Sequence, residues 1–192
     1  MNRTSFALAS LLVLILAVAG CAPNAPPRWA EGGSRLELAP ARWQRGEADT
    51  IELQADGRVL EGGSLRFVID RVGRVTDDDY DAYAVLLPDG HLVGTDDRAL
   101  GYVGVNNASP PLAAQAWLSL SPDGKVMFFQ ASGERVPLGQ WTGCNGPNRR
   151  TCTLVSQLFT ERNLRPRPIY APAYGPMYGP TFGVGVGVGM GY

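Results

Sequence analysis

The segment that decides the fold reads Leu118-Ser-Leu120-Ser-Pro-Asp123-Gly124-Lys-Val126. Apolar and polar residues alternate around the Asp-Gly pair, a pattern typical of a β-strand with one buried face. Asp-Gly readily adopts the positive φ angles that a two-residue hairpin turn requires. The segment is therefore predicted to form a strand, a tight turn and a second strand.

The same pattern occurs twice more, earlier in the chain. The copies read Ile51-Glu-Leu53-Gln-Ala-Asp56-Gly57-Arg-Val59 and Ala84-Val-Leu86-Leu-Pro-Asp89-Gly90-His-Leu92, so the Asp-Gly pairs lie 33 and 34 residues apart. Apolar residues before and after the three turns share a register and are expected to face one core: Leu53, Leu86, Leu120, Val59, Leu92 and Val126. Two interpretations stay open, a weak internal repeat of about 33 residues or a common hairpin signal that recurs in a β-rich chain.

Short apolar runs separated by turn signals extend from about Arg35 to Trp141. With 192 residues, 45% of them hydrophobic, the chain is long enough for one domain plus tails. We therefore expect an all-β domain of mostly antiparallel hairpins, arranged as a small barrel or a sandwich. After it, an apolar stripe favours a short helix packed on the sheet, with a final strand as the alternative; its residues are Leu154, Val155, Leu158 and Phe159.

The amino terminus has the composition of a targeting segment. One positive charge at Arg3 precedes the uncharged run FALASLLVLILAVA, residues 6–19. A helix of that length, at about 1.5 Å per residue, is too short for a hydrocarbon core of about 30 Å. Residues 1–20 are therefore predicted to be a signal peptide.

The residues that end this segment, Val18-Ala19-Gly20-Cys21, resemble the lipobox of bacterial lipoproteins. The resemblance implies that the chain is a lipoprotein precursor, cleaved before Cys21 and acylated on it. Several acyl chains would then anchor it stably to a membrane. Ala22 stands where an aspartate would imply retention at the inner membrane, so the resemblance favours the outer membrane, facing the periplasm or the surface. The alternative is an ordinary signal peptide with a coincidental cysteine.

A second resemblance concerns residues 49–160. The run Ala116-Trp117-Leu118-Ser119-Leu120 and the pair Trp141 and Cys144 are similar to uncharacterised bacterial envelope lipoproteins. That resemblance implies no particular activity.

Two further cysteines, Cys144 and Cys152, enclose a short segment that contains Gly146 and Pro147. In an oxidising compartment such a pair is predicted to form a disulfide. A structural zinc site needs four Cys or His ligands, and the chain has a single histidine, His91. No metal site and no cofactor are predicted.

The chain is thus divided into four parts. Residues 1–20 are the signal peptide, and residues 21–34, rich in Pro, Ala and Gly, are a flexible lipidated tether. Residues 35–165 form the β-rich globular domain. Residues 166–192, the C-terminal tail, repeat Pro-x-Tyr-Gly and then alternate Val and Gly. The tail is predicted to be disordered; alternatively, its aromatic side chains adhere to an envelope protein or to cell-wall glycan.

The sequence contains few motifs typical of catalysis or of ligand binding. It has neither a serine-hydrolase elbow nor a phosphate loop, and 17 basic residues balanced by 18 acidic ones give no footprint for nucleic acid. Asp77, Asp79 and Asp81 have the spacing of a calcium loop but lack its glycine and its final glutamate. A solvated loop is preferred to a looser calcium site with Asp96 and Asp97.

We therefore expect a membrane-anchored envelope lipoprotein with a non-enzymatic structural or interaction role and no catalytic residues. Two alternatives stay open. One is a small-ligand-binding module in which Trp117, Trp141 or the acidic loops line a pocket. The less favoured is a carboxylate-based hydrolase of cell-wall glycans.

Overall fold

Twelve short strands pair in sequence order, each antiparallel to the next, in residues 25–113 and 115–164, which the computed structural model describes. The last strand pairs back with the first, so the sheet is a closed barrel. The all-β prediction is confirmed, and of its two alternatives the barrel is the one observed. The strands are β1 (Ala41–Arg45), β2 (Ala48–Leu53), β3 (Arg58–Glu61), β4 (Ser64–Ile69), β5 (Arg74–Asp77), β6 (Ala82–Leu86), β7 (His91–Gly94), β8 (Ala99–Val103), β9 (Asn107–Ser109), β10 (Leu118–Leu120), β11 (Lys125–Phe129) and β12 (Arg135–Thr142).

The hairpins repeat at half the period that the sequence indicates. Turns at Gly73 and Asn106 lie between the three Asp-Gly turns, and successive turns are 16 to 18 residues apart. At every one of these turns a backbone carbonyl accepts an N–H from the end of the next hairpin. The pairs are Gly57 with Ile69 (2.9 Å), Gly73 with Leu86 (2.8 Å), Gly90 with Val103 (2.7 Å), Asn106 with Leu120 (2.7 Å) and Gly124 with Trp141 (2.8 Å).

The residues expected to share a core all face the barrel interior. Each is at most 4% exposed: Leu53, Leu86, Leu120, Val59, Leu92 and Val126. Strand alternation alone is sufficient for this result, because successive side chains of a strand point to opposite faces of the sheet.

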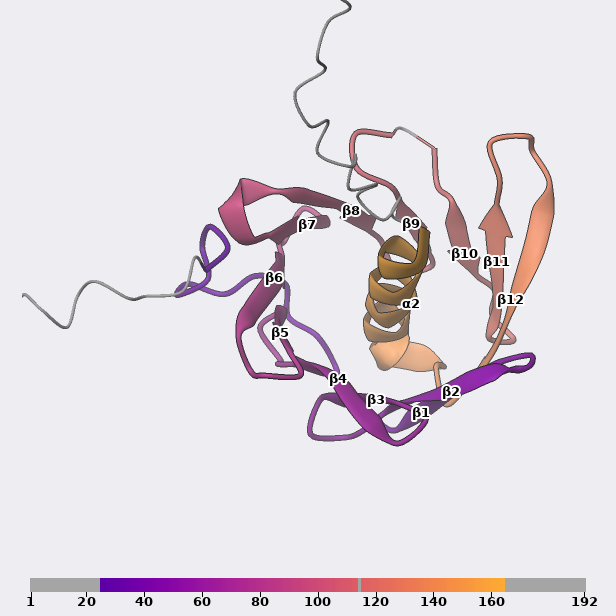
Figure 1. Cartoon of the computed structure of the whole chain (residues 1–192), viewed down its shortest axis with the longest axis horizontal. Coiled ribbons are helices and arrows are strands. Elements are labelled where there is room, and N and C mark those ends of the chain that lie inside the picture. The colour runs from indigo at the N-terminus through magenta and orange to yellow at the C-terminus, as the bar shows by residue number, and fades with distance from the viewer. Residues whose placement is uncertain (1–24, 114, 165–192) are drawn as a thin grey trace, which may run out of the picture.

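Helix α2 (Arg149–Leu164) runs through the centre of the barrel (Figure 1). The predicted helix is thus present, but it lies inside the sheet and does not pack on its outer face. Residues 151–161 are buried on every side of the helix, the polar ones included. Within the described residues, no helix is both long and apolar enough to cross a bilayer.

The buried polar side chains of α2 bond to the surrounding wall. Gln157 accepts a hydrogen bond from Trp117 Nε1 (2.7 Å) and donates to the carbonyls of Leu100 (2.9 Å) and Ser109 (3.2 Å). Three hydroxyls act similarly: Ser156 accepts from Trp141 Nε1 (2.9 Å), Thr151 donates to Glu37 O (2.7 Å) and Thr153 donates to Val105 O (2.8 Å). These bonds offset the cost of burying polar groups, so they fix the helix in one rotational position.

The disulfide joins the helix to the wall. Cys144 follows β12, Cys152 lies in the first turns of α2, and their Cα atoms are 6.1 Å apart. The short 3-10 helix Gly146–Asn148 turns the chain into the barrel between them. Closing so small a loop contributes about 2–3 kcal/mol to stability in the chain-entropy account.

The segment before β1 also contacts the barrel. Gly33 N–H donates to Val72 O (2.6 Å), and Ser34 N–H donates to Leu86 O (2.6 Å). The Arg74 guanidinium carbon lies 5.9 Å from the Trp29 ring centroid. Residues 29–34, predicted as part of the flexible tether, are thus docked on the wall. Their backbone N–H groups donate to carbonyls of the barrel, as strand ends do at the hairpin turns. The predicted signal peptide, the predicted acylation site Cys21 and the C-terminal tail lie outside the described residues.

Acid is expected to weaken the barrel through its Asp-Gly turns. The Arg58 backbone N–H lowers the pKa of Asp56, and the His91 backbone N–H lowers the pKa of Asp89. The Ser121 hydroxyl, and then the Lys125 ammonium, lower the pKa of Asp123 from 3.8 to about 2.

Since the folded pKa of Asp123 lies below the unfolded one, its contribution is present above about pH 4 and is lost as the pH falls to about 2. Urea midpoints should therefore fall through this window, and less steeply in Asp123→Asn. Parallel profiles for the variant and the parent would contradict the assignment.

Candidate functional site

The barrel wall opens at the seam between its first and last strands. β1 and β12 pair at Arg42–Thr142, Trp43–Trp141 and Gln44–Gln140, and β12 then continues with β11. β1 ends at Arg45, which pairs with Ala48 of β2, so beyond this point β12 runs beside β11 alone. Pro137 has no N–H to donate, and the register shift between β11 and β12 leaves Leu138 as an extra residue. A bulge of this kind bends the strand that carries it.

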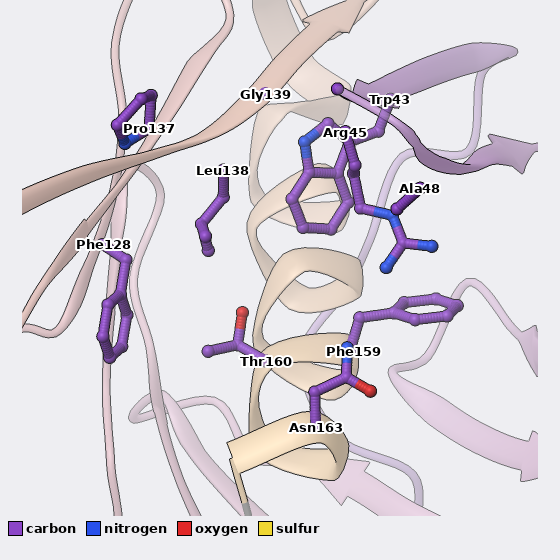
Figure 2. Close-up of a pocket in the computed structure, with 11 residues that line it drawn as sticks. Trp43, Arg45, Ala48, Phe128, Pro137, Leu138, Gly139, Phe159, Thr160 and Asn163 are labelled. Atoms are coloured by element: carbon purple, nitrogen blue, oxygen red, sulfur yellow. The ribbon is translucent and has the colours of Figure 1, made fainter.

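A pocket of about 470 Å³ occupies this seam, beside the C-terminal end of α2. Its volume falls within the range of about 300–1,000 Å³ that is usual for small-molecule sites. The side chains around it are mainly aromatic and aliphatic (Figure 2). The lining residues are Trp43, Arg45, Gly46, Ala48, Phe128, Pro137, Leu138, Gly139, Phe159, Thr160 and Asn163.

Trp43 is the deepest aromatic side chain of the pocket, at 1% exposed. Its ring stacks on Trp141, with centroids 5.6 Å apart and an interplanar angle of 18°. The indole N–H groups of Trp141 and Trp117 are bonded to α2. That of Trp43, by contrast, has no hydrogen-bond partner among the described residues.

Thr160 lies one turn after Ser156 on α2 and is 4% exposed. Its hydroxyl is also unpaired within the described part of the chain, and it points into the space beside Leu138 and Trp43 (Figure 2). A buried polar group left unpaired costs about 1–3 kcal/mol. Two of the residues that line the pocket, Trp43 and Thr160, therefore carry a buried polar atom without a hydrogen-bond partner in the described structure.

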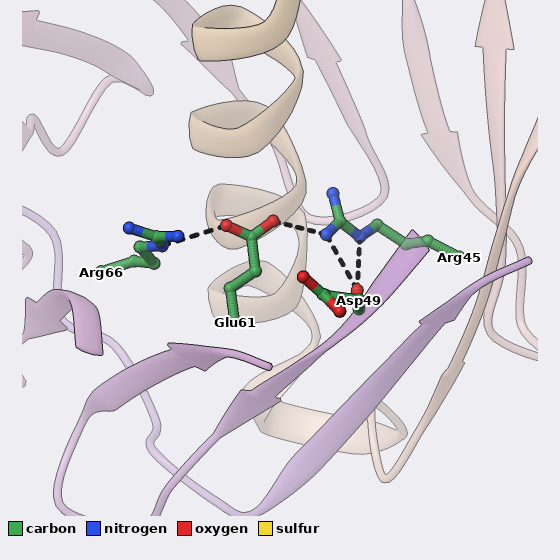
Figure 3. Close-up of polar contacts among 4 residues, drawn as sticks. All are labelled: Arg45, Asp49, Glu61 and Arg66. Carbon is green, nitrogen blue, oxygen red and sulfur yellow. Dashed lines mark hydrogen bonds and ion pairs between the residues drawn. The ribbon is translucent and has the colours of Figure 1, made fainter. Parts of the chain in front are cut away.

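Arg45 forms the charged edge of the site. Its Nη2 lies 2.5 Å from Glu61 Oε1, and its Nε and Nη2 donate to Asp49 O at 3.1 and 2.8 Å. Glu61 Oε2 also bonds Arg66 Nε at 3.0 Å, so one carboxylate bridges two guanidinium groups (Figure 3).

The guanidinium of Arg45 also covers aromatic faces. Its central carbon lies 5.6 Å from the Trp43 ring centroid and 5.4 Å from that of Phe159. Such cation–π contacts hold an arginine in place. Arg45 is thus a fixed part of the pocket wall.

The tryptophans predicted to line a pocket are not those that do so. Trp117 and Trp141 are bonded to Gln157 and Ser156, which prediction from the sequence could not anticipate because the partners lie on the enclosed helix. Trp43 was missed, since the residues around it form no recognisable motif. The signal that was available is the alternation around it, which places Trp43 on the buried face of the first strand.

The acidic run is a turn stabilised by its own backbone. Asp77 Oδ1 accepts the N–H groups of Asp79 (3.1 Å) and Asp81 (2.9 Å). Asp77 and Asp78 also border a smaller cavity of about 290 Å³ beside Tyr83. No group of three His, Cys, Asp or Glu side chains in the described ranges is arranged to hold a metal ion.

The fold and the site together define a class of protein: a closed barrel of β-hairpin repeats, with a polar helix along its axis and an apolar pocket at its seam. Comparison with protein-family models, with curated proteins and with solved structures finds no match to this chain.

Proposed function

We propose that this chain is a membrane-anchored lipoprotein of the cell envelope whose barrel binds a small, mainly apolar ligand without converting it. The observation that carries the proposal is the pocket of about 470 Å³ at the seam, two of whose lining residues each carry a buried polar atom that is unpaired in the described structure. Apolar walls provide affinity, and a small number of placed polar groups orient the ligand. The alternative, a purely structural envelope protein, does not explain why these two buried polar atoms lack hydrogen-bond partners.

The chemistry of the lining favours binding over catalysis. The Trp43 N–H and the Arg45 guanidinium donate hydrogen bonds and do not act as bases at neutral pH. General base catalysis needs a group that accepts a proton within hydrogen-bond reach of the substrate. Thr160 lacks such a neighbour among the described lining residues.

Anchoring is proposed through acyl chains on Cys21, most favourably in the outer membrane, facing the periplasm or the surface. Trp29, the first docked aromatic residue, is eight residues from Cys21. An extended chain of that length spans about 28 Å, so the barrel would stay close to the bilayer. The C-terminal tail, which follows α2, is proposed to contact an envelope protein or cell-wall glycan.

The anchor is tested by intact mass and fractionation. Protein from its host should be heavier than the polypeptide Cys21–Tyr192 by its acyl groups, and it should sediment with membranes. Cys21→Ala should abolish both properties. Unmodified, soluble wild-type protein would contradict the anchor.

The binding role is tested by native mass spectrometry of the full chain purified from envelope. Wild-type protein should carry a small molecule that Leu138→Trp, which fills the pocket, no longer retains. Leu112→Trp is the matched control, because the Leu112 side chain is fully exposed. Equal retention by all three proteins would show that the pocket is not a binding site.

A further inference from the structure

We infer that the seam pocket binds a molecule with an apolar body and a single carboxylate, and that the carboxylate pairs with Nη1 of Arg45. The inference rests on the proposed function and names the class of its ligand. In this role Arg45 selects an anion over a neutral or cationic molecule of the same size.

Nη1 is the part of the Arg45 guanidinium that has no protein partner in the described structure. Nε and Nη2 donate to Asp49 O, and Nη2 also donates to Glu61, whereas Nη1 carries no bond (Figure 3). Nη1 is not among the described side-chain atoms that are both enclosed and unpaired, so it is accessible. Hydrogen bonds between charged groups are roughly twice as strong as neutral ones, which makes an anion the preferred partner of this atom.

The guanidinium is held in place at the edge of the pocket before any ligand arrives. It lies between the rings of Trp43 and Phe159 (Figure 2), and its central carbon is 5.6 and 5.4 Å from their centroids. Its side chain is only 13% exposed. Because these contacts already restrict Arg45, a ligand that pairs with it has little side-chain freedom left to remove.

The charges around Arg45 favour one negative charge on the ligand. Glu61 is shared between two guanidinium groups, those of Arg45 (2.5 Å) and Arg66 (3.0 Å), so this cluster has one net positive charge. The residue Asp49 is exposed, and solvent screens its carboxylate. Among the described residues that line the pocket, Arg45 has the one charged side chain. A monoanion would balance the cluster, whereas a dianion would leave an excess charge in a mainly apolar site.

The volume of the pocket limits the ligand body. About 470 Å³ accommodates roughly fifteen non-hydrogen atoms, at about 30 Å³ for each. A medium-length acyl chain or a two-ring aromatic body with its carboxylate has this size. The two sources of such a ligand are therefore a free fatty acid and an aromatic acid.

The test measures the tryptophan fluorescence of the full chain in nanodiscs as each of four probes is added at neutral pH. The probes are octanoate, naphthoate, octanol and octylamine, and empty nanodiscs correct for uptake by the lipid. At least one of the two carboxylates is expected to bind about tenfold more tightly than octanol and octylamine. The order of the two carboxylates identifies the source.

Arg45→Met removes the charge but keeps an apolar side chain over the rings. It should weaken binding of the preferred carboxylate about tenfold or more and leave octanol unchanged, which also shows that the pocket is intact. Arg66→Met is the matched control, because Arg66 bonds the same Glu61 but does not line the pocket. It should change carboxylate affinity less than about threefold.

Glu61→Gln gives a second variant whose expected effect is a gain. It removes the charge that partly neutralises Arg45 while keeping the size of the side chain. Carboxylate affinity should rise about threefold or more, because the guanidinium then attracts an anion without competition. An arginine that only supports the pocket wall would give no gain.

Four outcomes would overturn the inference. If octanol or octylamine binds as tightly as the carboxylates, the assigned class is wrong although the pocket still binds ligands. If Arg45→Met and Arg66→Met weaken carboxylate binding equally, or if Glu61→Gln gives no gain, Arg45 does not pair with the ligand. If no probe binds but Leu138→Trp loses the molecule that wild type retains, the class alone is wrong. If no probe binds and Leu138→Trp retains the same molecules as wild type, the proposed function fails as well.

Discussion

Gln157→Leu is expected to destabilise the barrel by about 3–5 kcal/mol, because it leaves several buried groups unpaired at once. The Gln157 side chain is 0% exposed and makes three hydrogen bonds to the wall. Leucine has a similar volume, so cavity formation contributes little. The groups that lose their partner are the Trp117 N–H and the carbonyls of Leu100 and Ser109. Urea unfolding followed by circular dichroism measures the loss.

Arg162→Leu provides the control for this prediction. Arg162 lies on the same helix but is exposed, and its replacement should change stability by less than about 0.5 kcal/mol. A loss below about 1 kcal/mol for Gln157→Leu would mean that these hydrogen bonds do not hold the helix in the barrel.

Gly124→Ala is expected to cost about 3 kcal/mol or more, the range in which strain at a special backbone site adds to a steric clash. Gly124 has φ +86°, and a Cβ there would lie 2.2 Å from Trp141 O. The Trp141 N–H donates to Gly124 O at 2.8 Å, so the strand cannot move away without losing this bond. The substitution therefore acts on the contact that joins a turn to the next hairpin.

Gly133→Ala isolates the clash from the backbone strain. Gly133 has φ +85°, and its Cβ would meet nothing within 4 Å. Its replacement should cost about 1–2 kcal/mol, the usual penalty for the left-handed conformation. Equal losses for the two variants, measured by urea unfolding, would contradict the role given to the Gly124 contact.

Thr160 and Gln157 lie within one turn of α2, yet substitutions at the two positions are expected to have opposite effects. Gln157 has partners for its buried polar atoms, whereas the Thr160 hydroxyl has none in the described chain. Natural proteins commonly keep a destabilising residue where function depends on it, although a more stable substitution exists. The contrast therefore supports the position of the site at the C-terminal end of the helix.

Much of the local structure could be predicted because its causes are local. The turn at Asp123-Gly124 follows from the φ angles that glycine permits, and the alternation around it places Leu120 and Val126 on one face. The pairing of Cys144 with Cys152 follows in the same way from a short intervening segment. The intermediate turn at Asn106 was missed, because it lacks the Asp-Gly signal.

The site itself could not be predicted from the sequence. Trp43 lies against Trp141, 98 residues away, and the wall opens there because β1 turns into β2 after Arg45 while β12 continues beside β11. The unpaired state of the Trp43 N–H is visible only once the other two indoles are seen bonded to α2.

The amino-acid sequence by itself determined the hairpins, the helix and the disulfide loop, since backbone preference and side-chain periodicity act over a few residues. Tertiary structure alone decided that the sheet closes, that the helix lies inside it and that a pocket remains at the seam. Those features depend on which segments, far apart in the sequence, come into contact when the barrel closes. Contacts of this kind leave no recognisable pattern in a short stretch of sequence.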